Sequence, residues 1–405
     1  MAKKNTQQKR ADRRAGERGA ALILAIFTCV VLTVLAVGLT QVVRVEIIAS
    51  RSSLDRLQAS YLAKAGFNLG RSLLIFGDEQ DVDSIADSWY KLQDQAPIQL
   101  GEGWYKTVIV DACSMINVNE ANEEILTNIF GDPNIAAAIV TWHTDHGDFH
   151  SLGELTQIDG VDKAKVGELA HLLTVESRER NVPAKPPKRD DSTESQAQQR
   201  RANLNVQGVA MQNGAWMIPA GLNPGDSNDL AIANKIDAYR RPDKSREFKS
   251  LGELFDAGLN KDQVKRIIDY VALSDDDYQV GRVNLNTAPR EVLLALPEMK
   301  PQIADAIIAK RQEENGAFKS VGELLDMTEV TQEIFGKLAD HICTKSSTYI
   351  IESYAELNDK PVRRTVQGMV LRQPGPMAPL YYGWREVSRP TFIDTQDINS
   401  QEAAK

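Results

Sequence analysis

The stretch Glu17-Arg18-Gly19-Ala20-Ala21-Leu22-Ile23-Leu24 opens an apolar run that continues to Val43. From Ala20 to Val43 the run has 24 residues and no charge. At a helical rise of ~1.5 Å per residue this length spans ~36 Å, more than the ~30 Å hydrocarbon core of a bilayer. Residues 1–19 hold seven Lys or Arg and two acidic residues. The pattern predicts a single-pass membrane helix with a cytoplasmic N-terminus and everything after Arg44 across the membrane.

Three interpretations of this apolar run are considered. A cleaved secretory signal has an apolar core of ~7–15 residues and a small-x-small site after it, whereas this run is longer and 40–44 offers no such site. A plain single-pass anchor fits the hydropathy. The Gly19-Ala20 junction also resembles the leader junction of type IV pilins and pseudopilins. The resemblance implies that a prepilin peptidase removes residues 1–19 and that the mature chain begins at Ala20.

The helix is expected to continue beyond the apolar run. Residues 45–76 contain no proline, and apolar residues recur there every three or four positions with charges on much of the opposite side. The sequence therefore predicts one helix over residues 20–76, transmembrane in its first half and amphipathic in its second.

Strand signals lie on both sides of a long central segment. The first is 104–111, and the others come near the C-terminus at 349–354, 362–371 and 381–384, with a turn at 358–361. A sheet with one strand before and several after a segment makes that segment an insertion. The predicted class is α+β, with an antiparallel core over 77–116 and 346–390, an inserted all-α region over 117–345, and a flexible tail over 391–405. The resemblance to pilins implies that the core is pilin-like.

The insertion contains three copies of one pattern. Phe149-His-Ser-Leu-Gly-Glu-Leu155 recurs as Phe248-Lys-Ser-Leu-Gly-Glu-Leu254 and Phe318-Lys-Ser-Val-Gly-Glu-Leu324. An Asn-x-Asn precedes each copy, at 117–119, 203–205 and 284–286. Such repetition indicates a repeated supersecondary unit. Residues 178–202 contain three prolines, many charges and few large apolar residues, so we expect a mobile linker there.

A mechanical role explains the repeated Ser-x-x-Glu. In a capping box the Ser side chain accepts from the backbone of the third residue, and the Glu reaches back to the backbone of the Ser. The predicted boxes are Ser151 with Glu154, Ser250 with Glu253, and Ser320 with Glu323. The Asn-x-Asn segments are expected to cap the helices that follow them.

The composition and motifs of the sequence indicate no catalytic site. The formal net charge of −9 argues against general nucleic-acid binding, which depends on Lys and Arg. The sequence has no Cys-x-x-Cys, no His-Glu-x-x-His, no Gly-x-Ser-x-Gly and no phosphate-binding loop. We therefore expect a protein that is not an enzyme and has no catalytic residues.

Two cysteines flank the insertion. Cys113 lies at its entrance and Cys343 at its exit, so their sulfurs come near each other if the segment leaves and re-enters one sheet. A disulfide requires a Cα separation of ~4.4–6.8 Å. Two unrelated buried thiols fit the sequence equally well.

The chain resembles general secretion pathway protein K, the large minor pseudopilin of type II secretion. The resemblance rests on the Gly19-Ala20 junction, Val110-Asp-Ala-Cys-Ser-Met-Ile-Asn-Val-Asn119, Val283-Asn-Leu-Asn-Thr-Ala288 and the final strands 349–357 and 362–372. It implies a single-pass protein of the inner membrane whose periplasmic part lies at the tip of a pseudopilus. The implied partners are other minor pseudopilins and the inner-membrane secretion platform.

The resemblance also raises calcium as a cofactor, because protein K members can bind it through acidic loops. Here the corresponding region, 142–150, offers Asp145 and Asp148, while calcium takes six to eight oxygens. His143, His146 and His150 in the same region suggest zinc instead. A solvated loop without metal is the third interpretation.

The alternative function is a membrane-anchored DNA-uptake protein with helix-hairpin-helix repeats. Such hairpins usually carry Gly-apolar-Gly, which lets backbone N–H groups approach a phosphate. The third copy has Leu296-Pro-Glu-Met-Lys-Pro301 instead, and residues 280–345 hold eight basic and ten acidic residues. Nucleic acid is therefore not the expected partner.

Overall fold

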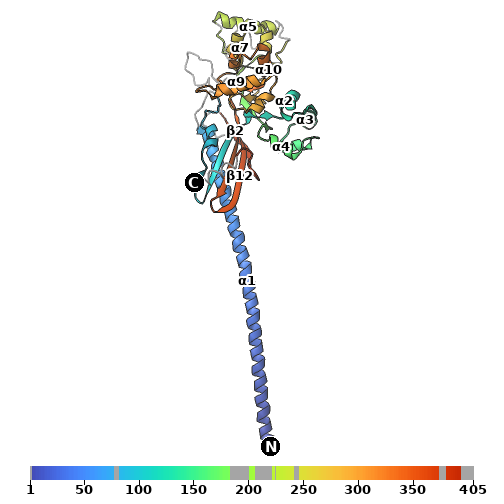
Figure 1. The fold of residues 1–405 in the computed structure, drawn as a ribbon, viewed down its shortest axis with the longest axis vertical. Helices are drawn as coiled ribbons and strands as arrows, with labels where there is room; N and C mark the ends of the chain where they lie inside the picture. Colours follow the sequence, from blue (N-terminus) through green and yellow to red (C-terminus); the bar gives the residue numbers. More distant parts are fainter. Residues whose placement is uncertain are drawn as a thin grey trace.

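The computed structural model describes residues 2–76, 82–182, 200–205, 221–223, 225–240, 246–373 and 380–393, with side chains from Leu22 onward except at 380–382. Its first element is one continuous helix, α1 (Ala2–Phe76). Figure 1 shows α1 projecting far from the rest of the molecule, with the N-terminus at its free end. Almost every residue from Leu22 to Gln58 is exposed, and burial begins at Ala59.

The C-terminal part of α1 packs on an antiparallel sheet. The sheet order is β1-β2-β11-β12-β13, and its strands are β1 (Ile98–Leu100), β2 (Gly103–Asp111), β11 (Thr348–Leu357), β12 (Lys360–Leu371) and β13 (Leu380–Val387). One row of small residues allows the approach: Ala59 and Ala63 are fully buried, and Gly66 faces Thr107 and Ser353. The helix and sheet thus share one apolar core.

The other face of the sheet is covered by the end of the described chain. Phe392 and Ile393 pack against Trp104, Val108 and Tyr354. The Glu352 carboxylate accepts hydrogen bonds from the backbone N–H groups of residues 391, 392 and 393, at 2.8, 2.8 and 3.1 Å. The prediction of a flexible tail from residue 391 is therefore wrong at its start, because two apolar residues and a buried carboxylate hold 391–393 on the sheet. Residues 394–405 lie outside the described part.

Residues 112–347 lie in the chain between β2 and β11, which are neighbours in the sheet with Asp111 opposite Tyr349. This helical region contains α2 (Glu123–Phe130), α3 (Pro133–His146), α4 (Lys163–Leu169), α5 (Ser227–Tyr239), α6 (Glu253–Asp256), α7 (Lys261–Ile267), α8 (Arg290–Ala295), α9 (Pro301–Gln312) and α10 (Gln332–Leu338). Figure 1 shows it at the end of the molecule away from the N-terminus.

Each of the three copies begins and ends on a two-residue parallel ladder. These ladders pair β3 (Ile116–Asn117) with β4 (Leu173–Thr174), β6 (Ala202–Asn203) with β7 (Val271–Ala272), and β9 (Val283–Asn284) with β10 (Ile342–Cys343). We refer to residues 116–174, 202–272 and 283–343 as the first, second and third copies. The sequence did not predict the ladders, because two-residue strands carry no periodic signal.

The predicted α+β class, with a long apolar helix and an antiparallel sheet, is confirmed. The predicted linker 178–202 is wrong at both ends. Arg178–Arg180 forms β5, which pairs with β8 (Tyr278–Val280), and Ala202 begins β6. Buried ionic contacts of Glu179 and Arg201 hold these ends, whereas a charged composition alone favours disorder. Residues 183–199 lie outside the described part.

Candidate functional site

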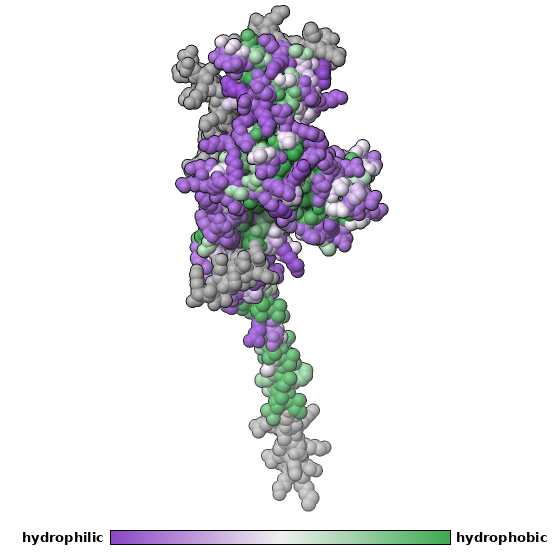
Figure 2. All heavy atoms as spheres, turned by 45° about the horizontal axis from the view of Figure 1, so that its top comes forward, coloured by the Kyte–Doolittle hydropathy of each residue, from purple (hydrophilic) through white to green (hydrophobic). Residues whose placement is uncertain are grey.

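The exposed part of α1 is a candidate membrane span. In the described part of the chain, α1 is the one helix long and apolar enough to cross a membrane. Figure 2 shows its apolar surface as a band between the globular part and the undescribed N-terminal side chains. Leu24, Leu35 and Leu39 are each more than 60% exposed, as lipid-facing side chains would be. Gly19 and Ala20 lie in this helix, and their side chains are outside the description.

The Asn-x-Asn segments act as clamps inside each copy. In the third copy, the Asn286 side chain accepts from the backbone N–H of Phe318 at 2.7 Å and donates to its carbonyl at 3.0 Å. Asn119 does the same to Phe149, and Asn205 to Phe248. The first Asn of each pair accepts from the backbone N–H of the second, at 3.1, 2.8 and 3.0 Å. The repeated Asn and Phe are thus one structural unit.

This arrangement corrects the predicted role of the Asn-x-Asn segments. None of these six asparagines caps the next helix: Asn122 caps α2, and Pro289 precedes α8. An Asn amide has both an acceptor and donors, so it can pair with one backbone N–H and one backbone carbonyl at once, which an acceptor-only Asp carboxylate cannot do. The clamp therefore fixes the chain entering a copy to the Phe that enters the buried core.

The predicted capping boxes are also wrong in detail. Ser151 makes no cap hydrogen bond, and Ser250 precedes Gly252, the N-cap of α6. Ser320 accepts from the N–H of Gly322. The Glu154 and Glu323 carboxylates accept hydrogen bonds from the backbone N–H groups of His150 and Lys319, each one residue before the predicted donor. The Glu253 carboxylate instead accepts a hydrogen bond from the Tyr239 hydroxyl. The motif begins tight 3₁₀ turns in the first and third copies, η3 (Leu152–Gln157) and η7 (Val321–Asp326), in which a full capping box does not form.

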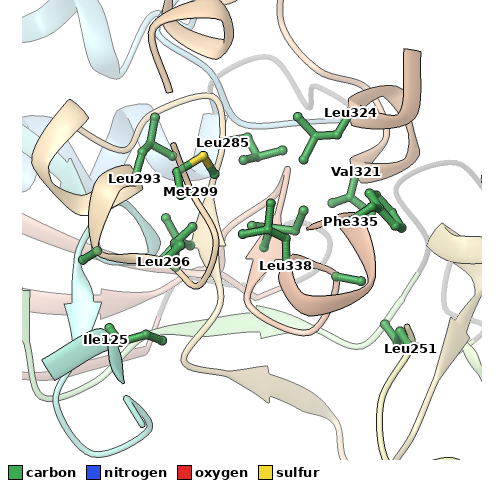
Figure 3. Packing of buried hydrophobic residues seen from close by; sticks show 14 of the residues in the cluster. Ile125, Leu251, Leu285, Leu293, Leu296, Met299, Val321, Leu324, Phe335 and Leu338 are labelled. Atoms are coloured by element: carbon green, nitrogen blue, oxygen red, sulfur yellow. The ribbon is translucent and has the colours of Figure 1, made fainter. Parts of the chain in front are cut away.

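The three copies share one apolar core. Figure 3 shows Ile125 of the first copy and Leu251 of the second in the same cluster as Leu285, Leu296 and Phe335 of the third. Gly252, from the repeated motif of the second copy, allows a close contact with α10 of the third copy. A Cβ on Gly252 would lie 2.4 Å from the carbonyl oxygen of Gly336 in α10. The three copies therefore pack against one another as one apolar cluster.

The hairpin turn of the third copy is unlike a phosphate-binding turn. Glu298 occupies a position with φ of 56°, where glycine is normally favoured. Its carboxylate pairs with Lys337 at 2.7 Å. A carboxylate offers no hydrogen-bond donor to a phosphate, and the nearby Lys337 ammonium is already paired with it.

A buried polar network lies where the helical region meets the sheet. Asp111, at the end of β2, accepts from the backbone of Cys113, the Asn284 amide and the Thr287 hydroxyl, at 2.7, 2.8 and 2.6 Å. Nearby, Asp83 accepts from Arg372 and from the backbone of Ser346, at 2.7 and 2.8 Å. Segments from β2, the third copy and the end of β12 therefore meet on two carboxylates. We name this set of residues the junction network.

The sequence did not single out this network. Asp83, Asp111 and Arg372 are far apart in the chain, and isolated charges are usually exposed. Burial raises the pKa of Asp111 to about 6, against the opposing effect of hydrogen bonds from Ser346, Thr287 and Asn284. For Arg372, burial disfavours the charged form, but the adjacent Asp83 carboxylate leaves its pKa raised overall.

The raised pKa of Asp111 predicts a pH-dependent stability. Between its unfolded pKa of ~3.9 and about 6, the folded state binds more protons, so the free energy of unfolding falls as pH rises, by about 2 kcal/mol between pH 4.5 and pH 7.5. Unfolding by urea, followed at pH 4.5 and 7.5, measures this change. Asp111→Asn is expected to flatten the pH dependence. Asp269, Asp340 and Glu352 also have raised pKa values and add to the pH dependence of the parent. The test is therefore the difference in pH dependence between Asp111→Asn and the parent. An equal change in the free energy of unfolding with pH in both proteins would contradict the raised pKa of Asp111.

A second buried ionic cluster joins the copies. Glu179 of β5 is 3% exposed and contacts Arg201, which is 8% exposed, and Arg282, at 3.5 Å. Arg201 also donates to the carbonyl of Asp269 at 3.0 Å. Burial lowers the pKa of Arg201, but the Glu179 carboxylate more than offsets this effect. One carboxylate thus contacts two buried guanidinium groups, from the residues directly before the second and third copies.

The candidate metal ligands are only partly brought together. His143 Nε2 lies 2.9 Å from Asp148 Oδ1. His146 instead stacks on Trp142 and contacts its carbonyl at 3.1 Å. Asp145 and His150 are exposed. Among the described residues, no group of three or more His, Cys, Asp or Glu is placed to hold a metal.

The comparisons with known proteins concern mainly the repeats. The family described as the helix-hairpin-helix motif matches residues 111–174 and 279–343, which include the first and third copies. No curated protein sequence matches the chain. A solved structure, the GspK-GspI-GspJ complex of the type 2 secretion system from enterotoxigenic Escherichia coli, is similar with a TM-score of 0.42 and 12% identity, over 84% of this chain and 100% of that chain. The first and third copies are thus similar to helix-hairpin-helix motifs.

Proposed function

We propose that the chain is a minor pseudopilin of a type II secretion system, a non-enzymatic component at the tip of the periplasmic pseudopilus. The observation that carries the proposal is the shape of α1. One uninterrupted helix has an apolar first part that is long enough to cross a bilayer and that no described residue covers. Its C-terminal part packs on an antiparallel sheet. A plain anchor needs no such continuity, whereas a subunit that moves as a rod from the membrane into a filament does.

The position of the helical region supports a tip. It lies beyond the sheet at the end away from the membrane helix (Figure 1), where it would obstruct a subunit stacked further out. Leu24, the fifth residue after Gly19, adds to this argument. A carboxylate at that depth would cost several kcal/mol unless a neighbouring chain's N-terminus paired with it. A subunit with nothing above it has no such partner, and leucine suits it.

The proposal assigns a topology and partners. The cytoplasmic leader is 1–19, the helix 20–76 crosses the inner membrane, and the core 77–116 with 346–390 and the insertion 117–345 are periplasmic. The partners would be a prepilin peptidase, other minor pseudopilins and the inner-membrane secretion platform. The proposal rests on this chain's own helix and sheet.

The test is complementation of a chromosomal deletion. In the deletion strain, proteins normally found in the medium are expected to accumulate in the periplasm, as measured by mass spectrometry of both fractions. Wild-type protein should restore export, while Gly19→Leu should remain an uncleaved precursor and restore none. Gly16→Leu, the same change three residues upstream, is the matched control and should complement. Unchanged export in the deletion strain would refute the proposal.

The helix-hairpin-helix match favours one alternative, a membrane-anchored DNA-uptake protein. The Glu298 turn argues against it, as does the acidic balance of residues 280–345. Loss of DNA uptake with normal export in the deletion strain would establish this alternative.

A further inference from the structure

The segment of α1 between the membrane span and the sheet carries two arginines on one side. Arg44 directly follows the apolar run, and Arg51 comes seven residues later. Because an α-helix has ~3.6 residues per turn, a spacing of seven is nearly two turns, and the two residues lie on the same side of the helix. Both are exposed. Figure 2 shows hydrophilic side chains on α1 between the apolar band and the globular part.

Within the described part of the chain, no acidic residue neutralises these two arginines. Neither side chain forms an ion pair or a hydrogen bond with another described residue. Asp55, one turn beyond Arg51, pairs instead with Lys360 at 2.7 Å. Glu46 comes two residues after Arg44, and residues two apart point to different sides of a helix. Two guanidinium groups are therefore available to a ligand outside the chain.

The geometry of the helix directs both side chains toward the membrane. Each Cα–Cβ bond of an α-helix tilts toward its N-terminus, which for this segment is the direction of the membrane span. With Val43 at the edge of the hydrocarbon core, Arg44 enters the headgroup layer, and the Cα of Arg51 lies ~12 Å from that edge. The headgroup layer is ~5–7 Å thick. The remaining distance from Arg51 to the headgroups is shorter than the Debye length of ~8 Å at physiological salt, so both charges act on the headgroups.

We propose that Arg44 and Arg51 bind the phosphates of anionic phospholipid headgroups at the surface where α1 leaves the membrane. A guanidinium group has paired N–H donors that match two oxygens of a phosphate. The headgroups are the phosphates that adjoin the membrane span directly, and an anionic headgroup complements the positive charge. The inference goes beyond the proposed function, because it requires that α1 spans a membrane and requires no role in secretion. The contact fixes the depth of α1 in the bilayer.

The experiment measures lipid association with the full-length chain. The protein is inserted into preformed phosphatidylcholine vesicles, so that the large folded part stays outside and the basic residues 1–19 lie on the inner surface. Spin-labelled phosphatidylglycerol or phosphatidylcholine is then added to the outer leaflet, and electron paramagnetic resonance measures the fraction of labelled lipid that the protein immobilises. Two arginines opposed by Glu46 leave one net positive charge, for which a ~fivefold preference for phosphatidylglycerol is expected.

Arg44→Gln combined with Arg51→Gln is expected to reduce this preference ratio to one or below, whereas Glu46→Gln should raise it. Arg56→Gln is the matched control, because Arg56 is exposed on the same helix but lies ~20 Å beyond Val43, more than a Debye length from the headgroups. This control should keep the ratio of the parent.

A ratio of one in the parent would overturn the inference, as would equal ratios in the double variant and Arg56→Gln. All four substituted positions are exposed, so the variants are expected to keep the fold. Complementation of export tests the proposed function separately, because the lipid preference is measured without any other component of a secretion system.

Discussion

Replacing Glu179 with alanine is expected to lower the free energy of unfolding by ~3–5 kcal/mol. The carboxylate is the shared ion-pair partner of Arg201 and Arg282, and all three side chains are less than 10% exposed. Its loss leaves two buried cations without the carboxylate that they both contact. Chemical unfolding of the detergent-solubilised chain, followed by tryptophan fluorescence, measures the change.

Glu176→Ala provides the matched control for this prediction. Glu176 pairs with Arg178 at 2.8 Å, but the two side chains are 26% and 35% exposed. Exposed pairs contribute ~0–1 kcal/mol, so this variant should unfold almost as the parent does. Equal effects of the two substitutions would show that the cluster around Glu179 contributes no more than a surface pair.

Gly66→Leu is expected to destabilise the docking of α1 on the sheet by ~3 kcal/mol, the upper end of the usual cost of overpacking. A Cβ at this position would lie 2.2 Å from Ser353 Oγ, 2.4 Å from Thr107 Oγ1 and 2.7 Å from Tyr105 Cδ2, so the helix must move away. Gly167→Leu in α4 is the control, because no atom lies within 4 Å of a Cβ built there. Limited proteolysis at the sheet, together with urea unfolding, reports the effect. Equal resistance of both variants would contradict the close approach.

The elements with local periodic signals were predicted from the sequence. The long helix has a continuous apolar pattern, and the strands β2, β11 and β12 follow runs of β-branched and aromatic residues. The turn between β11 and β12 was placed correctly at Asn358, although β12 already begins at Lys360. These patterns depend on neighbours within a few residues, which a sequence displays directly.

The contacts that assemble the copies depend on residues far apart in the chain. The clamp between Asn286 and Phe318 joins side chain to backbone across 32 residues, while helix-capping rules consider only three or four. The sequence does show an Asn-x-Asn before each Phe motif. It does not show that the second Asn contacts the Phe backbone, because that contact forms only in the folded chain. The junction network and the Glu179 cluster left no signal, since a buried charge and an exposed one look alike in sequence.

The most direct test of the account is the N-terminus of the protein extracted from its membrane. The basic leader, the Gly19-Ala20 junction and the continuous α1 predict a mature chain that begins at Ala20 and keeps its apolar helix. Intact mass together with N-terminal sequencing decides this. A chain still beginning at residue 1 or 2, or one beginning beyond Val43, would contradict the assignment of a pseudopilin.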